Sequence, residues 1–301
     1  MRVFSATGVI GYGYLESSLK AGMARNPHFL GGDAGSTDLG PYYLGAGESF
    51  TSRPMVKRDI RLMLLAAREK RIPLLIGSAG SAGGEPHLQW GHEIIREIAR
   101  EDGLHFRLAL IHSEQDKAFI KARLAEGKVR PLGPVPALTA EDVDRAERIV
   151  GMMGAEPYQK ALEMGADVVL AGRSSDSAIF AAIPLLHGFD PGLVWHMAKT
   201  IECGVSPIGR PRLAPDSVMA HIRRDHFIIE PLDPRLVCPA VRVASHTLYE
   251  NPSPYYLYEP SGMLDTSGAR YEQYDERCVK VSGSRFVHAE KIGRASCRER
   301  V

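Results

Sequence analysis

The sequence predicts an α/β fold in which a doubly wound, mainly parallel sheet is followed by a smaller strand-rich region. Two observations lead to this prediction. Up to about residue 205, short apolar runs alternate with amphipathic stretches, which is typical of a parallel sheet covered by helices on both faces. Beyond that point prolines and tyrosines become frequent and apolar residues alternate singly with polar ones, which indicates strands.

The strands of the first region are predicted from short apolar runs that end in glycine or polar residues. They lie at residues 3–4, 28–30, 72–76, 106–111 and 167–171. The segment 31–45, GGDAGSTDLGPYYLG, follows the second run. Its glycines and Pro41 break helices, so we predict that it is an irregular loop and not a helix.

The helices are predicted from apolar residues spaced three and four apart, together with start and stop signals. Pro54 after Ser52 begins one helix, and Thr139 with Asp142 forms a capping-box pattern that begins another. The predicted helices cover residues 14–25, 51–70, around 90–98, 115–125, 139–150, 157–165, 175–186 and 191–202.

The second region begins with an alternating run at 218–222, and residues 227–229 return across an Arg-Arg-Asp turn as a hairpin. We therefore divide the chain into an α/β ligand-binding domain, 1–205, and a strand-rich region, 206–291. Residues 292–301, IGRASCRERV, read as the translation of a common sequencing adapter. We expect this tail to be a scar and the strand-rich region to be truncated, which would make the chain a fragment.

Composition narrows the class of protein. The formal net charge of +1 gives no electrostatic basis for binding nucleic acid or an anionic membrane. No apolar run exceeds about ten residues, so no membrane span is expected. The chain has four cysteines without a CxxC spacing, and no signal peptide is evident. These features predict a cytoplasmic protein with reduced thiols.

Candidate site residues follow one strand after another. In an open parallel sheet, ligands bind beyond the carboxyl ends of the strands, and the loops there converge on one edge. The residues at these positions are Gly11 and Gly13 after the first strand, Asp33, Ser36, Thr37 and Asp38 after the second, Ser78, Gly80 and Ser81 after the third, His112 after the fourth, and Arg173, Ser174 and Asp176 after residues 167–171.

Asp38, Asp176 and Ser174 are the predicted catalytic residues. The two carboxylates suit a general acid–base pair, or oxygen ligands for a divalent cation. Neither choice is decided by the sequence, and Asp176 is equally well placed to cap the helix that follows it. His112 is a candidate proton shuttle, although a histidine at a strand end more often bonds nearby backbone.

The glycine-rich loops are candidate binding segments. Residues 77–84, GSAGSAGG, lack the lysine of a nucleotide-hydrolysing P-loop, but small residues before a helix suit a phosphate, CoA or carboxylate group. A plain flexible turn is the alternative. Arg173 is predicted to grip such an anion in bidentate fashion. Residues 8–13 read GxxGxG and not GxGxxG, so a nicotinamide site is the weaker reading of that turn.

Four long segments resemble one known family. They are GGDAGSTDLGPYYLGAG, LLIGSAGSAGG, VVLAGRSSDSAIFAAIPLLHGFDPGLVWHMAKTIECG and SHTLYENPSPYYLYEPSGMLDT. They are similar to the acyclic terpene utilisation (AtuA-type) family, and the resemblance extends to Lys291. It implies a cytoplasmic catabolic protein in the degradation of citronellol- and geraniol-type acids through CoA thioesters, with a branched acid or its thioester as ligand. It supplies no catalytic residues.

These observations predict an enzyme that acts on a carboxylate or an acyl-CoA as a hydratase or lyase. The alternatives are a non-catalytic acyl-CoA-binding or assembly subunit of a catabolic complex, and a dinucleotide-dependent oxidoreductase. The expected partner is a small-molecule carboxylate or CoA thioester, with neither nucleic acid nor membrane. The cofactor is left open, a divalent cation included, and so is a homo-oligomer.

Overall fold

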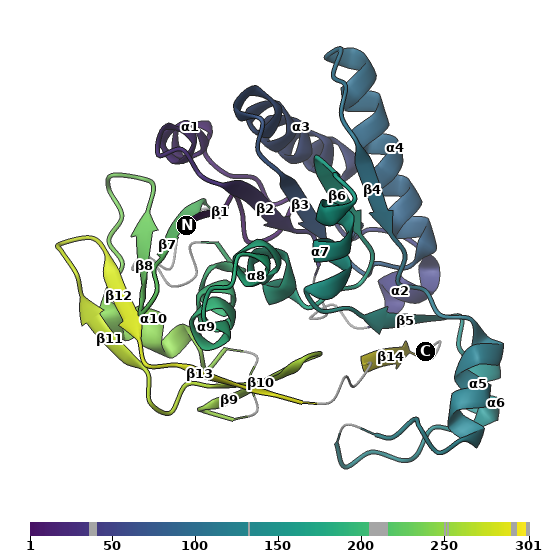
Figure 1. Cartoon of the computed structure of the whole chain (residues 1–301). Helices are drawn as coiled ribbons and strands as arrows, with labels where there is room; N and C mark the ends of the chain where they lie inside the picture. The colour runs from purple at the N-terminus through teal and green to yellow at the C-terminus, as the bar shows by residue number, and fades with distance from the viewer. Residues whose placement is uncertain are drawn as a thin grey trace.

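The computed structural model describes residues 1–35, 41–131, 133–204, 216–249, 251 and 253–289, and the backbone of 294–298. Its centre is a nine-stranded sheet in the order β11-β12-β8-β7-β1-β2-β3-β6-β4 (Figure 1). Five strands run parallel in the core: β1 (Arg2–Ser5), β2 (Phe29–Asp33), β3 (Leu74–Gly77), β6 (Val168–Ala171) and β4 (Leu108–Ile111). The predicted α/β fold class with a mainly parallel core is confirmed.

Antiparallel strands from the second region continue this sheet. They are β7 (Val218–Ile222), β8 (Phe227–Pro231), β12 (Val279–Ser282) and β11 (Arg270–Gln273). The predicted hairpin is confirmed as β7 and β8, and β7 pairs directly with β1. A separate antiparallel sheet holds β13 (Arg285–His288), β10 (Gly262–Asp265) and β9 (Tyr256–Glu259), while β14 (Arg294–Arg298) pairs with β5 (Arg148–Met152).

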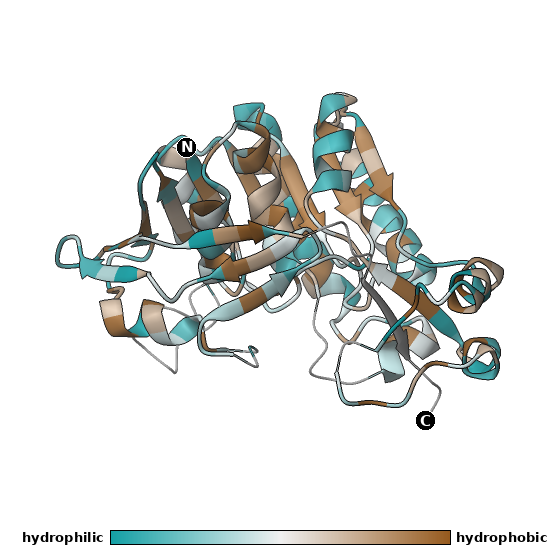
Figure 2. Ribbon diagram, turned by 60° about the horizontal axis from the view of Figure 1, so that its bottom comes forward, coloured by the Kyte–Doolittle hydropathy of each residue, from teal (hydrophilic) through white to brown (hydrophobic). Residues whose placement is uncertain are grey.

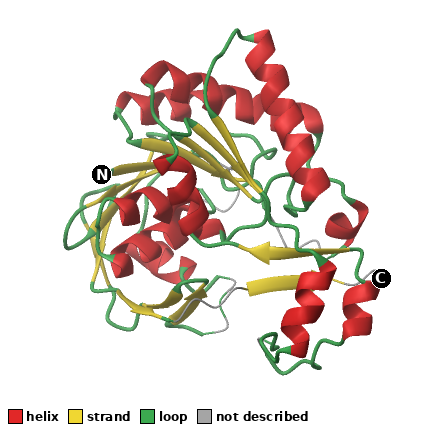
Figure 3. Ribbon diagram, turned by 45° about the vertical axis from the view of Figure 1, so that its right-hand side comes forward, coloured by secondary structure: helices red, strands yellow, loops and turns green. Residues whose placement is uncertain are grey.

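Helices cover both faces of the large sheet (Figure 3). One face carries α1 (Glu16–Ala24), α3 (Arg53–Lys70) and α4 (Glu85–Glu101), and the other carries α7 (Glu156–Glu163), α8 (Asp176–Leu186) and α9 (Pro191–Ile201). Shorter helices lie at the periphery: α2 (Tyr42–Ala46), α5 (Lys117–Ala125), α6 (Ala140–Arg145) and α10 (Ala240–His246). No helix of the described residues is long and apolar enough to cross a membrane.

The core lies in two layers, one on each side of the sheet. Phe29 and Leu30 are adjacent in β2, yet both are fully buried because their side chains point to opposite, covered faces. This is why the parallel strands read as continuous apolar runs, and Figure 2 shows them as largely hydrophobic. Helix α8 is buried along most of its length between the sheet and α9.

The segment predicted to be a loop at 31–45 is more regular than expected. Strand β2 continues to Asp33 because glycines allow both helical layers to approach. A Cβ at Gly31 would lie 2.5 Å from the Phe180 ring, and one at Gly32 would lie 2.7 Å from Cε of Met63. The prediction that the segment contains no helix was wrong, since α2 forms there with Pro41 at its N-cap, where a missing N–H costs nothing.

The predicted helix over 139–150 was too long. Its capping box is present, because Thr139 and Asp142 bond each other's backbone N–H groups. Helix α6 nevertheless ends at Arg145, and Ala146 is extended at φ −59° and ψ 129°. The β-branched residues that follow form β5, where such side chains fit better than in a helix.

Candidate functional site

Loops from the parallel strands meet at the carboxyl edge of the sheet, as the sequence predicts. The N–H of Ile10 donates to the carbonyl of Asp33 at 2.7 Å, which joins the loops after β1 and β2. The N–H of Ser78 donates to the Gly172 carbonyl at 3.1 Å, which joins the loops after β3 and β6. The Ser113 hydroxyl, after β4, accepts from the N–H of Arg173 at 2.8 Å.

At the centre of this edge lie Arg173, Asp176 and Asp33. Nη2 of Arg173 is 3.4 Å from Oδ1 of Asp176. Nη1 of Arg173 and Oδ1 of Asp33 are both buried, and neither has a hydrogen-bond partner among the described residues. Buried polar atoms are almost always paired, so two unpaired atoms at one site are unusual. A Cβ at Gly35 would lie 2.9 Å from Nη1 of Arg173, so the loop after β2 lies directly on the guanidinium.

The electrostatic environment of Asp33 favours its protonated form. Burial raises the pKa of Asp33 well above its ordinary value, and the nearby Asp176 raises it further. Arg173 and a hydrogen bond from the N–H of Gly35 act in the opposite direction but do not offset this. A buried carboxyl with a raised pKa beside a second carboxylate is an arrangement that acid–base chemistry uses.

Ser174 belongs to a hydrogen-bonded group beneath these charges. Its hydroxyl lies 2.9 Å from the hydroxyl of Tyr158 on α7, and its N–H donates to Oγ of Ser78 at 3.3 Å. Burial raises the pKa of Tyr158 above its ordinary value, so the phenol stays protonated. Ser174 and Ser78 are both fully buried, and they join the loop after β3 to the loop after β6.

Asp176 does not occupy the N-cap position of α8, which was the alternative role for this residue. Ser175 occupies the N-cap position of α8 and makes no side-chain capping bond, while Asp176 is the first helical residue. Its carboxylate therefore acts on the helix through charge and not through a cap hydrogen bond. Its side chain is 26% exposed, whereas that of Arg173 is 11% exposed, so Asp176 lies on the solvent side of the pair.

Sequence reasoning missed two buried carboxyls beside this site. Glu202, just after α9, accepts from the Ser177 hydroxyl at 2.7 Å and from the Nζ of Lys199. Glu259, at the end of β9, accepts from the Ser175 hydroxyl at 2.5 Å. A lysine and a glutamate three residues apart at the end of a largely apolar helix were the available signal for Glu202.

Both of these carboxyls, Glu202 and Glu259, have raised pKa values. Burial raises the pKa of Glu202 to about 7, and Lys199 opposes that shift while Asp176 adds to it. Burial also raises the pKa of Glu259 to about 7, with the Ser175 hydrogen bond opposing and Glu202 adding to the shift. Clusters of perturbed carboxyls in one place are typical of functional sites, although ion-pair networks also produce them.

The predicted binding residues in the first loop serve an internal carboxylate. The N–H groups of Gly11 and Gly13 both donate to Oδ2 of Asp59, at 2.8 and 3.0 Å. Asp59 lies on α3 and is fully buried. A pair of backbone amides around a carboxylate is a small anion nest, which here is filled by the chain itself.

The glycine-rich loop after β3 is closely packed. Ser78 and Ser81 are buried with positive φ angles, and a Cβ at Gly80 would lie 2.8 Å from Cβ of His87. The N-terminus of α4 that follows already receives the Glu114 carboxylate, which accepts from the N–H of Glu85 at 2.7 Å. His112 is exposed and its Nδ1 lies 2.7 Å from Glu85. The predicted residues Ser36, Thr37 and Asp38 lie outside the described residues.

Two cavities lie away from these charges. One of about 440 Å³ is lined by α7, the α8–α9 corner and the small sheet, with Trp195 and Phe189 among its walls. The other, of about 360 Å³, lies between α4 and β4. Within the described part of the chain, no three His, Cys, Asp or Glu side chains are arranged to hold a metal ion.

Fold and site together define an α/β protein in which two buried polar atoms at the carboxyl edge of a mixed sheet have no hydrogen-bond partner among the described residues. The model of the acyclic terpene utilisation family protein AtuA matches residues 53–203, half of the chain, and the chain belongs to this family. Membership implies a part in acyclic terpene utilisation. The matched region contains Arg173, Asp176 and Glu202, while Asp33 and Glu259 lie outside it. Neither the curated proteins nor the solved structures yielded a match.

Proposed function

We propose that the chain is a catabolic enzyme of the hydratase or lyase type that acts on a branched carboxylic acid or its CoA thioester. One observation carries this proposal: the unpaired Nη1 of Arg173 lies buried in a site with the unpaired Oδ1 of Asp33, and Asp176 stands on its solvent side. A guanidinium N–H without a partner is suited to a substrate oxygen. A cytoplasmic location would fit such a catabolic role.

Arg173 would bind a carboxylate oxygen or the carbonyl oxygen of a thioester. In hydration, Asp176 takes a proton from water, whose oxygen bonds to the β-carbon as the carbon–carbon double bond opens. Asp33 gives its proton to the α-carbon, and Arg173 stabilises the negative charge that passes through the carbonyl oxygen. Proton return from Asp176 to Asp33 restores the site, so the net change is addition of one water. The reverse sequence is dehydration.

Residues from the other predicted loops would support this chemistry. Ser174 and Ser78 hold the backbone on which Arg173 and Asp176 stand. Asp38 remains a predicted catalytic carboxylate on the loop that begins at Asp33. It would take the place of Asp33 as the acid–base partner of Asp176, or share a divalent cation with Asp176. Ser36 and Thr37 would add hydroxyl contacts to the bound group.

The test is turnover on a defined panel. The purified protein is mixed with branched, acyclic enoyl-CoA and 3-hydroxyacyl-CoA thioesters and their free acids, and the conjugated enoyl thioester is followed by its ultraviolet absorbance. Asp33→Asn and Asp176→Asn should each lower turnover about 10²- to 10⁴-fold. Asp225→Asn, in the exposed β7–β8 turn, is the control. Full activity in both site variants would overturn the proposal.

A second candidate, a non-catalytic acyl-CoA-binding or assembly subunit, is favoured by an aromatic surface near the site. Tyr255, Tyr256 and Tyr258 in and beside β9 are between 39% and 56% exposed. Exposed aromatic groups of this kind are enriched at protein interfaces. This candidate predicts binding of the same thioesters in calorimetry without turnover, and a stable complex with a partner subunit. Turnover of any panel member would exclude it.

A further inference from the structure

The residues on either side of Asp176 are held by two carboxyls from different parts of the chain. Ser175 donates to Glu259 on β9 at 2.5 Å, and Ser177 donates to Glu202 after α9 at 2.7 Å. Asp176 therefore sits between two anchored hydroxyls at the first turn of α8. All four anchoring side chains are buried.

These contacts span the fold. Helix α9 packs along α8, and the small sheet that contains β9 contacts α9 from the other side (Figure 1). Glu259 thus ties the antiparallel sheet, which lies outside the matched family region, to the first residue before α8. A hydrogen bond to a carboxyl in a dry environment is stronger than one in water, and losing one partner leaves a buried group unsatisfied.

We infer that Glu202 and Glu259 are positioning residues that clamp residues 175–177, and that this clamp is tightest while both carboxyls hold their protons. The clamp bears on activity through the role proposed above for Asp176, so that part of the inference rests on the proposed function. The clamp itself does not.

The charges around the clamp explain its dependence on pH. Lys199 on α9 acts on both carboxyls, while Asp176 at the start of α8 acts on Glu202 and Glu202 acts on Asp33 at the end of β2. Two further groups lie next to these: Arg173 pairs with Asp176, and His246 on α10 lies near Lys199. Protonated, the two glutamic acids accept from serine without mutual repulsion. Ionised, they repel each other and Asp176 in a buried space, and the Lys199 ammonium beside Glu202 offsets this only in part.

The direction in which stability changes with pH follows from the linkage between proton binding and folding. The pKa of each glutamic acid is raised from 4.5 to about 7, so the folded protein binds more protons than the unfolded chain between these values. Their contribution to stability is fully present below pH 4.5 and is lost as pH rises through about 7. Above that pH the two ionised carboxylates should loosen residues 175–177.

The experiment is hydrogen–deuterium exchange of the full chain, read at peptides that contain residues 175–177 and corrected for intrinsic exchange. Wild-type protection should fall about tenfold between about pH 6 and about pH 8.5. Glu259→Gln and Glu202→Gln keep an acceptor without charge, so both should stay protected at the higher pH. Glu259→Ala should exchange about tenfold faster at both values.

Asp216→Asn is the matched control. Asp216 is also a buried carboxyl that accepts from a serine, Ser18 at 2.6 Å, and burial raises its pKa, but it lies beside α1. Its substitution should leave exchange at 175–177 as in the wild type. If Glu259→Ala also leaves that exchange unchanged, or if wild-type protection is the same at both pH values, the clamp is refuted without any reference to substrate.

Turnover of the thioester panel separates a positioning role from a merely structural one. At about pH 6.5, Glu259→Ala should lower kcat about tenfold with KM unchanged, and Glu259→Gln should restore it. The alkaline limb of the wild-type kcat profile should move to higher pH in Glu259→Gln. If hydrogen–deuterium exchange changes as expected but neither the wild type nor any variant turns over a thioester, the proposed function is refuted and the clamp is kept. The two failures are therefore distinguishable.

Discussion

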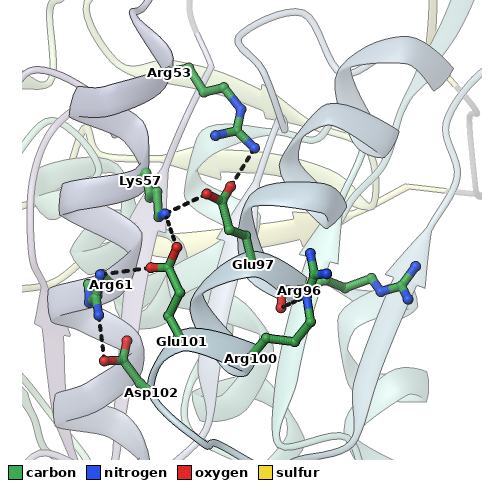
Figure 4. A network of polar contacts seen from close by, with 8 residues as sticks. All are labelled: Arg53, Lys57, Arg61, Arg96, Glu97, Arg100, Glu101 and Asp102. Atoms are coloured by element: carbon green, nitrogen blue, oxygen red, sulfur yellow. Dashed lines mark hydrogen bonds and ion pairs between the residues drawn. The ribbon is translucent and has the colours of Figure 1, made fainter.

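Two charged clusters, an outer cluster between the helices on one face of the sheet and an edge cluster at its carboxyl edge, use the same residue types in different ways. Between α3 and α4, Lys57 bonds both Glu97 and Glu101 at 2.7 Å, and Arg61 pairs with Glu101 and Asp102 (Figure 4). There each charge meets an opposite one at the surface. Oδ2 of Asp102 is buried without a described hydrogen-bond partner, but its Oδ1 is paired with Arg61. At the carboxyl edge, an acidic and a basic atom, Oδ1 of Asp33 and Nη1 of Arg173, are both buried without one.

The pKa values of the carboxyls shift in opposite directions in the two clusters. In the outer cluster, hydrogen bonds from Lys57 and Arg53 lower the pKa of Glu97 to about 2, as expected for a satisfied carboxylate. At the carboxyl edge, burial raises the pKa of Asp33, Glu202 and Glu259. Paired surface charges contribute little to stability, and salt weakens them. Buried carboxyls with raised pKa values stay available for proton transfer. Burial, more than the number of charges, distinguishes the carboxyl-edge cluster from the outer one.

The largest expected effect comes from Asp176→Asn. Turnover on the thioester panel should fall about 10²- to 10⁴-fold because the proton acceptor is lost. A residue that acted only on the helix dipole would cost about 0.3–1 kcal/mol of stability and leave turnover intact. Measuring kcat and the free energy of unfolding on the same preparation decides between the two. Intact turnover with that small loss of stability would make the edge cluster structural, like the outer one.

Gly83→Ala should give the largest loss of stability. Gly83 has φ +74°, and a Cβ there would lie 2.1 Å from the N atom of Arg173. Strain and overpacking together should cost about 3–5 kcal/mol, measured by urea unfolding. Gly127→Ala is the control, since Gly127 has φ +67° but open space around it, and should cost about 1 kcal/mol. Equal losses would mean that the loop after β3 does not press on Arg173.

Much of this geometry was predictable from the sequence, because strand–helix alternation places the loops after β1, β2, β3, β4 and β6 at one edge. That reasoning placed Arg173 and Asp176 at this edge, where the structure has them. It could not find Glu259, since contacts between β9 and the start of α8 depend on tertiary packing and leave no local pattern. It also could not foresee that Gly11 and Gly13 would serve Asp59, because a buried aspartate on an amphipathic helix looks like an exposed one.

Asp33→Asn should stabilise the protein at alkaline pH. The raised pKa of Asp33 means that its ionisation opposes folding, so wild-type stability falls as pH rises from about 4 through the raised value. Asparagine removes this dependence. The variant should match the wild type at about pH 4 and exceed it by about 1–3 kcal/mol at about pH 8, measured by urea unfolding, with turnover reduced. A variant that is less stable than the wild type at the higher pH would show that Asp33 is ionised and paired.

The smallest effect is expected in the outer cluster. Lys57→Met removes the hydrogen bonds to Glu97 and Glu101, but the neighbouring Arg53 and Arg61 still pair with these carboxylates. Because the partners keep a cation and water reaches them, turnover should be unchanged and the unfolding midpoint should shift slightly at low salt and not at high salt. The Asp33→Asn difference should persist in both salt conditions, since a buried carboxyl is screened poorly. A salt-independent loss in Lys57→Met would show that the outer cluster is shielded from solvent, and burial alone would no longer separate the two clusters.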